Sequence, residues 1–170
     1  GAVSAGCLAS DGHHVIGVDP NQTKVDLIIA GRTPIIETNI GEMISAAVTS
    51  GRLRATTHIG DAILSSDISV ICVGTPSQLN GNLDLSYVRR VCEQIGEALE
   101  GKDSYHVVAA RSTMLPGSMR GVVIPTLEAW SGKIAGVDFG VCNNPEFLRE
   151  GTAVWDYYHP PKTVIGETDT

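Results

Sequence analysis

The sequence lacks any long hydrophobic run. No stretch of roughly 18 or more apolar residues occurs, so a transmembrane helix is not expected. The first residues also lack the basic and leucine-rich regions of a signal peptide, and no initiator Met stands before Gly1. We therefore expect a cytoplasmic protein whose natural chain begins upstream of Gly1.

Cysteine is scarce and scattered. The four cysteines are Cys7, Cys72, Cys92 and Cys142, and no CxxC pair occurs among them. This pattern favours four buried thiols in a reducing compartment over a disulfide framework. The five histidines do not supply the clustered ligands that a zinc site needs, so no metal site is expected.

Basic residues are also few. Lys and Arg number 12 against 19 Asp and Glu, which gives a formal net charge of -7. An acidic surface argues against a general nucleic-acid binder, because phosphate backbones are bound by basic faces. A single anion site built from the backbone amides of a helix start remains compatible with this charge.

What the sequence does contain is a regular alternation of helical and strand patterns. The predicted helices span 2–10, 21–31, 40–52, 60–67, 83–101 and 117–132, and the predicted strands span 15–19, 53–58, 68–74, 105–111, 139–142 and 163–167. The alternation predicts an α/β fold with a Rossmann-like, doubly wound, mostly parallel sheet. The apolar run at 68–74 indicates a strand that is covered on both faces, and Pro125 is expected to kink its helix.

The first nineteen residues match the later part of a dinucleotide-binding βαβ unit. Such a unit opens with a strand and a glycine-rich turn, and continues with a helix, a second strand and an acid. Gly1 stands in the place of the third glycine, and Asp19 stands in the place of the acid. The sheet is therefore expected to lack its first strand, and residues 1–170 to form a partial NAD-binding domain.

Asp19 favours NAD over NADP, because a carboxylate accepts hydrogen bonds from a ribose diol and repels a 2′-phosphate. The alternative is an acid that forms a turn before Pro20 and Asn21. Lys24 follows one helical turn later. It lies either beside the same ribose or phosphate or on a solvated helix face.

Two threonines follow neighbouring strands of the expected sheet. Thr75 stands in "CVGTPS" and Thr113 in "ARSTMLPGS", each directly after an apolar strand. Ligands of open α/β sheets bind beyond the carboxyl ends of the strands, so both hydroxyls are candidates for cofactor contacts. The alternative for either residue is a helix cap or a turn.

The segment "NNPEFLREG" at 143–151 is the densest patch of reactive side chains. Glu146 and Glu150 are four residues apart and would share a face if the segment were helical. Arg149 offers a two-pronged donor to a phosphate or a carboxylate. The alternative is a charged surface turn in which Phe147 and Leu148 point into the core.

Four collinear stretches together resemble the nucleotide-sugar 6-dehydrogenases, the family of the UDP-glucose and GDP-mannose enzymes. They are "HHVIGVDPNQTKVDLIIAGRTPI", "CVGTPSQLNGNLDLSYV", "ARSTMLPGS" and "NPEFLREGTAVWDYYHPPKTVIGE". Two local signatures, "CVGTPS" with "NGNLDL" and "PPKTVIGE", resemble the branch that acts on GDP-mannose. The resemblance spans essentially the whole chain.

The resemblance implies an NAD-dependent, two-step oxidation of a sugar C6 alcohol to a carboxylate in a cytoplasmic homo-oligomer. Gly1, Asp19, Lys24, Thr75 and Thr113 would contact NAD, and Thr113 would also help to hold the hydrolytic water. Glu146 would act as acid, base or water-positioning group. The nucleotide sugar would be bound by the segment made of Glu146, Phe147, Leu148, Arg149 and Glu150.

The sequence also departs from the family pattern. The family's catalytic cysteine and lysine, its central helix and its second α/β domain have no counterpart in these residues, so none of the four cysteines is assigned to catalysis. "IIETNIGEM" at 35–43 replaces the usual Glu-Pro-Gly. Two other functions stay open: a different oxidoreductase on the same sheet, such as a 3-hydroxy acid dehydrogenase, and a nucleotide-binding module without catalysis.

Overall fold

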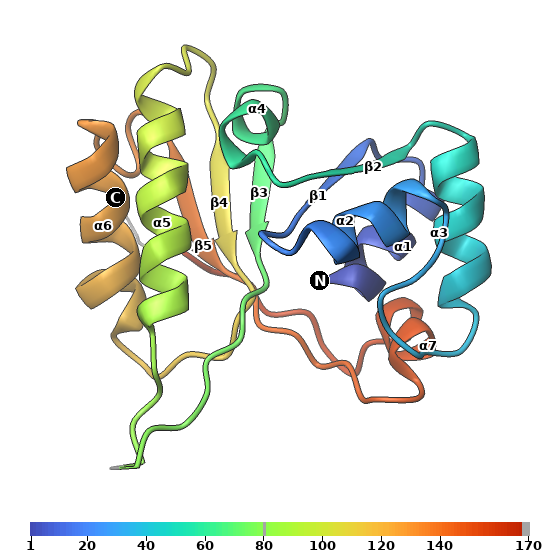
Figure 1. The fold of residues 1–170 in the computed structure, drawn as a ribbon. Helices are drawn as coiled ribbons and strands as arrows, with labels where there is room; N and C mark the ends of the chain where they lie inside the picture. Colours follow the sequence, from blue (N-terminus) through green and yellow to red (C-terminus); the bar gives the residue numbers. More distant parts are fainter. Residues whose placement is uncertain (80, 168–170) are drawn as a thin grey trace. The chain divides into compact units, whose positions relative to one another are not determined.

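The computed structural model describes residues 1–79 and 81–167, so Asn80 of the "NGNLDL" signature lies outside the described residues. The chain divides into two compact units. The first comprises Gly1–His58 and Phe147–Lys162, and the second comprises Ile59–Glu146 and, among the described residues, 163–167. The expected α/β class with mostly parallel strands is confirmed, and the described strands pair in two sheets rather than one (Figure 1).

The first unit holds a parallel pair of strands, β1 (Val15–Val18) and β2 (Leu53–Thr56), with Val15 opposite Leu53. Its helices are α1 (Ala2–Ser10), α2 (Gln22–Ile29), α3 (Ile40–Thr49) and α7 (Ala153–Tyr158). Helix α2 begins where the sequence predicts, because the Asn21 side chain accepts a hydrogen bond from the Thr23 amide at 3.0 Å. The core of this unit lies around Ile40 and Ile44 of α3.

Helix α7 is absent from the elements expected from the sequence. It has only six residues, and Thr152, the residue before it, makes no side-chain cap. It packs on α1, where Ala153 joins the buried Val3 and Cys7 in one apolar cluster. Tertiary packing therefore supports a helix that is too short to be stable by its own hydrogen bonds.

The second unit holds a four-stranded sheet in the order β3-β4-β5-β6. Strands β3 (Ile68–Ile71), β4 (Val107–Ala110) and β5 (Gly140–Asn143) run parallel, and the two-residue β6 (Gly166–Glu167) is antiparallel to β5. The expected strand at 163–167 is thus confirmed only at its end. Helix α4 (Ile59–Leu64) precedes β3, and α5 (Ser86–Glu100) and α6 (Ile124–Ser131) lie side by side in Figure 1.

The core of the second unit is built on the apolar face of α5. Val88, Cys92, Ile95 and Leu99 are buried there, as their spacing predicts. Gly96 lets α6 approach closely, because an added Cβ would lie 2.7 Å from the Trp130 Cβ and 3.1 Å from the Leu127 carbonyl oxygen. A larger side chain at position 96 would therefore push α5 and α6 apart.

Proline reshapes the helix expected at 117–132. A π-helical segment, η1 (Met119–Val123), leads directly into α6, which begins at Ile124 with Pro125 in its first turn. Pro125 has no backbone N–H to donate to the turn before it, which interrupts the regular hydrogen-bond pattern of the helix there. The irregularity thus lies before the proline, in the π-turn, rather than as a bend within α6.

Two predictions of burial are wrong. Ile68 and Val70 of β3 are 58% and 41% exposed, so this face of the strand is not covered within the residues that the structure describes. Among the cysteines, Cys7 and Cys92 are buried, but Cys142 is half-buried and Cys72 is exposed. None of the helices in residues 1–79 and 81–167 is long and apolar enough to cross a membrane.

Candidate cofactor and substrate sites

The carboxylate of Asp19 stands at the carboxyl end of β1, where the Asp19 amide still bonds the Thr56 carbonyl of β2. One carboxylate oxygen accepts a hydrogen bond from the Asn21 amide at 2.9 Å, and the other lies 3.1 Å from the Lys24 ammonium. Asp19 therefore forms a turn and an ion pair at once. The pair is solvent-exposed and contributes only about 0–1 kcal/mol to stability.

Gly1 forms the start of α1, and its carbonyl accepts the Ala5 amide at 2.9 Å. No side chain caps this helix, and its first turn carries no acid. The amides of the first turn and the positive end of the helix dipole are therefore available to an anion. This is the arrangement that a pyrophosphate requires.

Thr75 and Thr113 are brought together at the carboxyl ends of β3 and β4. The Thr75 hydroxyl donates to the Thr113 carbonyl at 2.8 Å. The neighbouring Ser112 is buried, and its hydroxyl bonds the Val73 carbonyl at 2.7 Å. The Thr113 side chain is exposed, and its hydroxyl has no hydrogen bond within the part of the chain that the structure describes. It is therefore available to a ligand.

Sequence reasoning missed Arg111 and Asn144. The Arg111 guanidinium bonds the Glu146 carboxylate at 2.9 Å and the Asn144 side-chain oxygen at 2.8 Å. The Asn144 side chain donates in turn to the Val164 carbonyl at 2.9 Å. Both residues directly follow a strand, so the rule that singled out the threonines would also have identified them.

The segment after Glu146 is not helical, so Glu146 and Glu150 do not share a helix face. The Arg149 guanidinium forms a fork with the Asp156 carboxylate, with contacts of 3.1 and 2.7 Å. The carboxylate that Arg149 binds is thus the Asp156 side chain of the same chain. These bonds hold the pKa of Asp156 well below its usual range.

The remaining side chains of this segment divide between the surface and the core. Leu148 packs against the cluster of Val3 and Cys7, whereas Phe147 is 37% exposed with the Lys162 ammonium 5.2 Å from its ring centre. The alternative that placed both Phe147 and Leu148 in the core therefore fits only Leu148. Glu150 is exposed and has no hydrogen-bond partner among the described residues.

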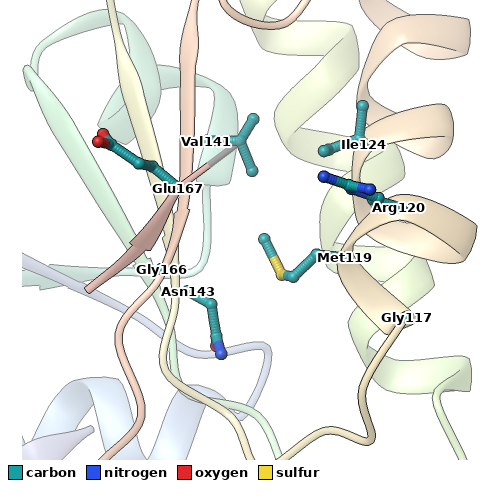
Figure 2. Close-up of a pocket in the computed structure, with 8 residues that line it drawn as sticks. All are labelled: Gly117, Met119, Arg120, Ile124, Val141, Asn143, Gly166 and Glu167. Atoms are coloured by element: carbon teal, nitrogen blue, oxygen red, sulfur yellow. The ribbon is translucent and has the colours of Figure 1, made fainter. Parts of the chain in front are cut away.

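The candidate residues fall in both units. Gly1, Asp19, Lys24 and the Phe147–Glu150 segment belong to the first, while Thr75, Thr113 and Glu146 belong to the second. None of them lines the pocket of about 380 Å³ in the second unit. Figure 2 shows Met119 and Ile124 facing Val141 across this pocket, with Arg120 and Glu167 on opposite sides.

Three of the four cysteines, Cys7, Cys92 and Cys142, are not activated nucleophiles. Burial raises the pKa of the Cys7 thiol to about 11 and that of Cys92 to about 12, and it also raises the pKa of Cys142. These thiols stay protonated at neutral pH and are poor nucleophiles. Over residues 1–79 and 81–167, no group of three or more His, Cys, Asp or Glu side chains could hold a metal ion.

The family model and similar relatives all point to the same protein family. All 170 residues match the model of the UDP-glucose/GDP-mannose dehydrogenase family, NAD binding domain. The chain is 56% identical over 169 residues to GDP-mannose 6-dehydrogenase of Azotobacter vinelandii. This match covers 99% of the present chain and 39% of that relative. It is 39% identical over 170 residues to a UDP-glucose 6-dehydrogenase of Haloferax volcanii. This match covers 99% of the present chain and 39% of that relative.

Solved structures agree with these relatives. A ternary complex of GDP-mannose dehydrogenase from Pseudomonas aeruginosa superposes with a TM-score of 0.98 at 56% identity, over 99% of this chain and 39% of that one. A UDP-glucose dehydrogenase from Pyrobaculum islandicum gives a TM-score of 0.93 at 38% identity, over 99% of this chain and 38% of that one. The chain thus spans about 39% of the length of the curated relatives it matches.

The described residues also fit the cofactor of such a domain. An uncapped helix start at Gly1 suits a pyrophosphate, and the Asp19 carboxylate at the end of β1 suits a ribose diol. The chain belongs to the UDP-glucose/GDP-mannose dehydrogenase family, matches the NAD-binding domain of that family, and has NAD as its cofactor.

Proposed function

We propose that the protein containing this chain oxidises the C6 alcohol of GDP-mannose to a carboxylate, giving GDP-mannuronate, the precursor of alginate. The observation that carries the proposal is the contrast in identity. The chain is 54–56% identical to six GDP-mannose 6-dehydrogenases but 37–39% identical to two UDP-glucose enzymes. UDP-glucose or another UDP-sugar is the second candidate substrate, favoured by the UDP-glucose relatives that also match the whole chain.

In the first unit, α1 and the end of β1 hold the cofactor. The free amides at the start of α1, from Gly1 onward, bind the pyrophosphate. The Asp19 carboxylate accepts hydrogen bonds from the adenosine ribose, and Lys24 keeps that carboxylate oriented through their 3.1 Å contact. Bound NAD supplies the chemistry of hydride acceptance.

In the second unit, the loops after β3, β4 and β5 carry the polar groups of the reaction. Thr75 contacts NAD and fixes the Thr113 backbone, which leaves the Thr113 hydroxyl to bind NAD and the hydrolytic water. Glu146 acts as acid, base or water-positioning group. Arg111 holds Glu146 in place through a charge-assisted hydrogen bond.

The segment Phe147–Glu150 of the first unit binds the nucleotide sugar. The side chains of Phe147 and Glu150 lie at the surface of the first unit. Leu148 packs against the apolar cluster, and the Arg149 amide bonds the Asp156 carboxylate, so the backbone between them is fixed. Arg149 therefore shapes the segment, and Glu150 is the side chain offered to the substrate.

The test is a comparison of substrates with the full-length protein. We expect two NADH formed for each GDP-mannose consumed, and a kcat/KM for UDP-glucose that is lower by about 100-fold or more. The reverse preference would support the second candidate substrate. No NADH with any nucleotide sugar would contradict the proposal.

We extend the proposal to the assembly and its compartment. The family resemblance supports a homo-oligomer, and the four unpaired cysteines support the cytoplasm. Light scattering on the full-length protein tests the first point, and fractionation of the producing cells tests the second.

A further inference from the structure

Glu37 makes a contact that spans most of the sequence. Its two carboxylate oxygens accept the Gly151 amide at 2.8 Å and the Ala153 amide at 3.2 Å, which lie 114 and 116 residues further along the chain. The Thr38 amide donates to the same carboxylate at 3.2 Å. All of these residues lie within the first unit.

A second carboxylate, that of Asp156, also holds this segment. Asp156 accepts the Arg149 amide at 2.9 Å, in addition to the guanidinium of Arg149 and the Thr152 hydroxyl at 3.0 Å. The amide of residue 149 therefore points at Asp156, and the amides of residues 151 and 153 point at Glu37. We call the segment 147–153 the clamped loop.

The clamped loop depends on these carboxylates for its shape. Before α7 begins at Ala153 it has no helical or strand structure to satisfy its amides. Leu148 and Ala153 anchor it in the apolar cluster with Val3 and Cys7, and this leaves the chain between them to be fixed by hydrogen bonds. Amides bonded to a carboxylate are held more strongly than amides bonded to neutral acceptors.

We propose that Glu37 is a positioning residue that sets the conformation of the clamped loop for nucleotide-sugar binding. This inference depends on the proposed function, which places the sugar nucleotide against Phe147–Glu150. Asp156 lies within α7, only seven residues from Arg149, and fixes the loop locally. Glu37 instead ties the loop to the segment before α3 through two backbone amides, and so adds a fixed point on another part of the first unit.

The loop that carries Glu37 has a conformation suited to this task. Asn39 adopts φ 66°, a left-handed conformation that asparagine tolerates better than most residues, and α3 begins at the next residue. Thr38 adds a contact from its hydroxyl to the Gly151 carbonyl at 3.5 Å. The chain thus turns sharply after Glu37, with two consecutive side chains directed to Gly151.

The experiment compares Glu37→Gln with the full-length wild type. A glutamine has one acceptor oxygen and a donating NH₂ group, so one of the Gly151 and Ala153 amides loses its acceptor. We expect KM for the nucleotide sugar to rise about tenfold or more, since a misplaced binding segment has large effects. The Kd for NAD should stay within about twofold, as fits a change confined to the sugar site.

The matched control is Glu128→Gln. The Glu128 carboxylate also accepts a loop amide, that of Ala135 at 3.1 Å, but it belongs to α6 of the second unit and contacts no candidate residue. We expect KM for the nucleotide sugar to be unchanged in this variant. Hydrogen exchange of the Gly151 and Ala153 amides should accelerate in Glu37→Gln and not in Glu128→Gln.

The outcomes separate the inference from the proposed function. A wild type that is inactive with every nucleotide sugar contradicts the proposed function. An active wild type with unchanged KM in Glu37→Gln overturns this inference alone, as does a lower kcat with unchanged KM, which indicates only a smaller folded fraction. If Glu37→Gln does not fold, Glu37→Asp decides by the same criteria, because it keeps the charge but shortens the reach.

Discussion

At the scale of single residues, charged side chains in this domain are fixed by backbone amides rather than by solvent. Asp19 accepts the Asn21 amide, Asp156 the Arg149 amide and Glu37 the amides of Gly151 and Ala153. A carboxylate held in this way has a defined direction before any ligand arrives. Such preorganisation lowers the entropy cost of binding.

Asp19 is predicted to control both affinity for NAD and discrimination against NADP. In Asp19→Ala the ribose loses a charged acceptor, a loss of about 1.5–3 kcal/mol that raises the Kd for NAD about 10- to 100-fold. The ratio of the Kd for NAD to that for NADP should rise. Fluorescence titration of the full-length protein measures both. Asp26→Ala, on the same helix as Lys24, should bind NAD normally, and weakened binding in this control would contradict the prediction.

His106 is predicted to make stability depend on pH. It is fully buried, its Nδ1 contacts the Ser66 carbonyl at 3.0 Å, and its Nε2 contacts the Ser69 hydroxyl at 2.7 Å. A carbonyl only accepts, so Nδ1 carries the proton and Nε2 accepts from Ser69 in the neutral ring. Burial lowers the pKa of His106, and the hydrogen bond to Ser66 opposes this only in part, with Lys102 and Asp67 as the nearby charges.

Because the folded state disfavours the proton, the unfolded chain binds more protons below the ordinary histidine pKa of about 6.5. The free energy of unfolding should therefore be highest above this pH and should decrease as the pH falls from about 7 to 5.5. Urea unfolding across this range measures the slope. The slope should be smaller in His106→Gln, and an equal slope in both proteins would refute the assignment to His106.

Arg111 is predicted to be required for the geometry of Glu146 rather than for its charge alone. In Arg111→Lys the cation remains, but the fork that reaches both Glu146 and Asn144 is lost. We expect kcat to fall about tenfold in Arg111→Lys and further in Arg111→Met, in steady-state assays of the full-length protein. Arg120→Met, which removes an exposed arginine from the same unit, should keep the wild-type kcat.

At the scale of elements, a long apolar periodicity predicts a helix or strand and its burial better than a short apolar run does. The helix predicted at 83–101 is observed as α5, because its apolar positions repeat over four turns. Helix α7 was missed because its six residues depend on packing against Val3 and Cys7. The covered strand predicted at 68–74 is exposed at Ile68 and Val70, since an apolar run specifies a strand but not its place in a sheet.

The packing of α5 on α6 gives a prediction at this scale. In Gly96→Ala the new methyl group meets Trp130 and the Leu127 carbonyl at distances too short for contact. We expect a destabilisation of about 1–3 kcal/mol, measured by denaturant unfolding of the full-length protein. Gly101→Ala is the control, because a Cβ there meets nothing within 4 Å. Equal stability of the two variants would contradict the close packing.

At the scale of the whole molecule, the chain combines two compact units, each with its own apolar core. The candidate residues for NAD occur in both units. A ligand that contacts only the folded state stabilises it by mass action. NAD binding and folding of the domain should therefore be coupled.

NAD binding is therefore predicted to raise the free energy of unfolding. Adding NAD at 100 times its Kd should stabilise the full-length protein by about 2.7 kcal/mol, measured as a shift of the unfolding midpoint in urea. The same concentration of NADP should give a smaller shift, because of the Asp19 carboxylate. An equal effect of both cofactors, or no effect of NAD, would contradict the assigned role of the first unit.

The sequence by itself determined the α/β class, the family and the strand ends that carry Asp19, Thr75, Thr113 and Glu146, because hydrophobic period and short motifs are local properties. Only the tertiary structure showed that Arg149 is bound by Asp156, that Arg111 holds Glu146, and that Glu37 fixes the loop at 147–153. Those contacts join side chains to partners that local patterns do not specify. Their geometry exists only once the strands and helices have packed.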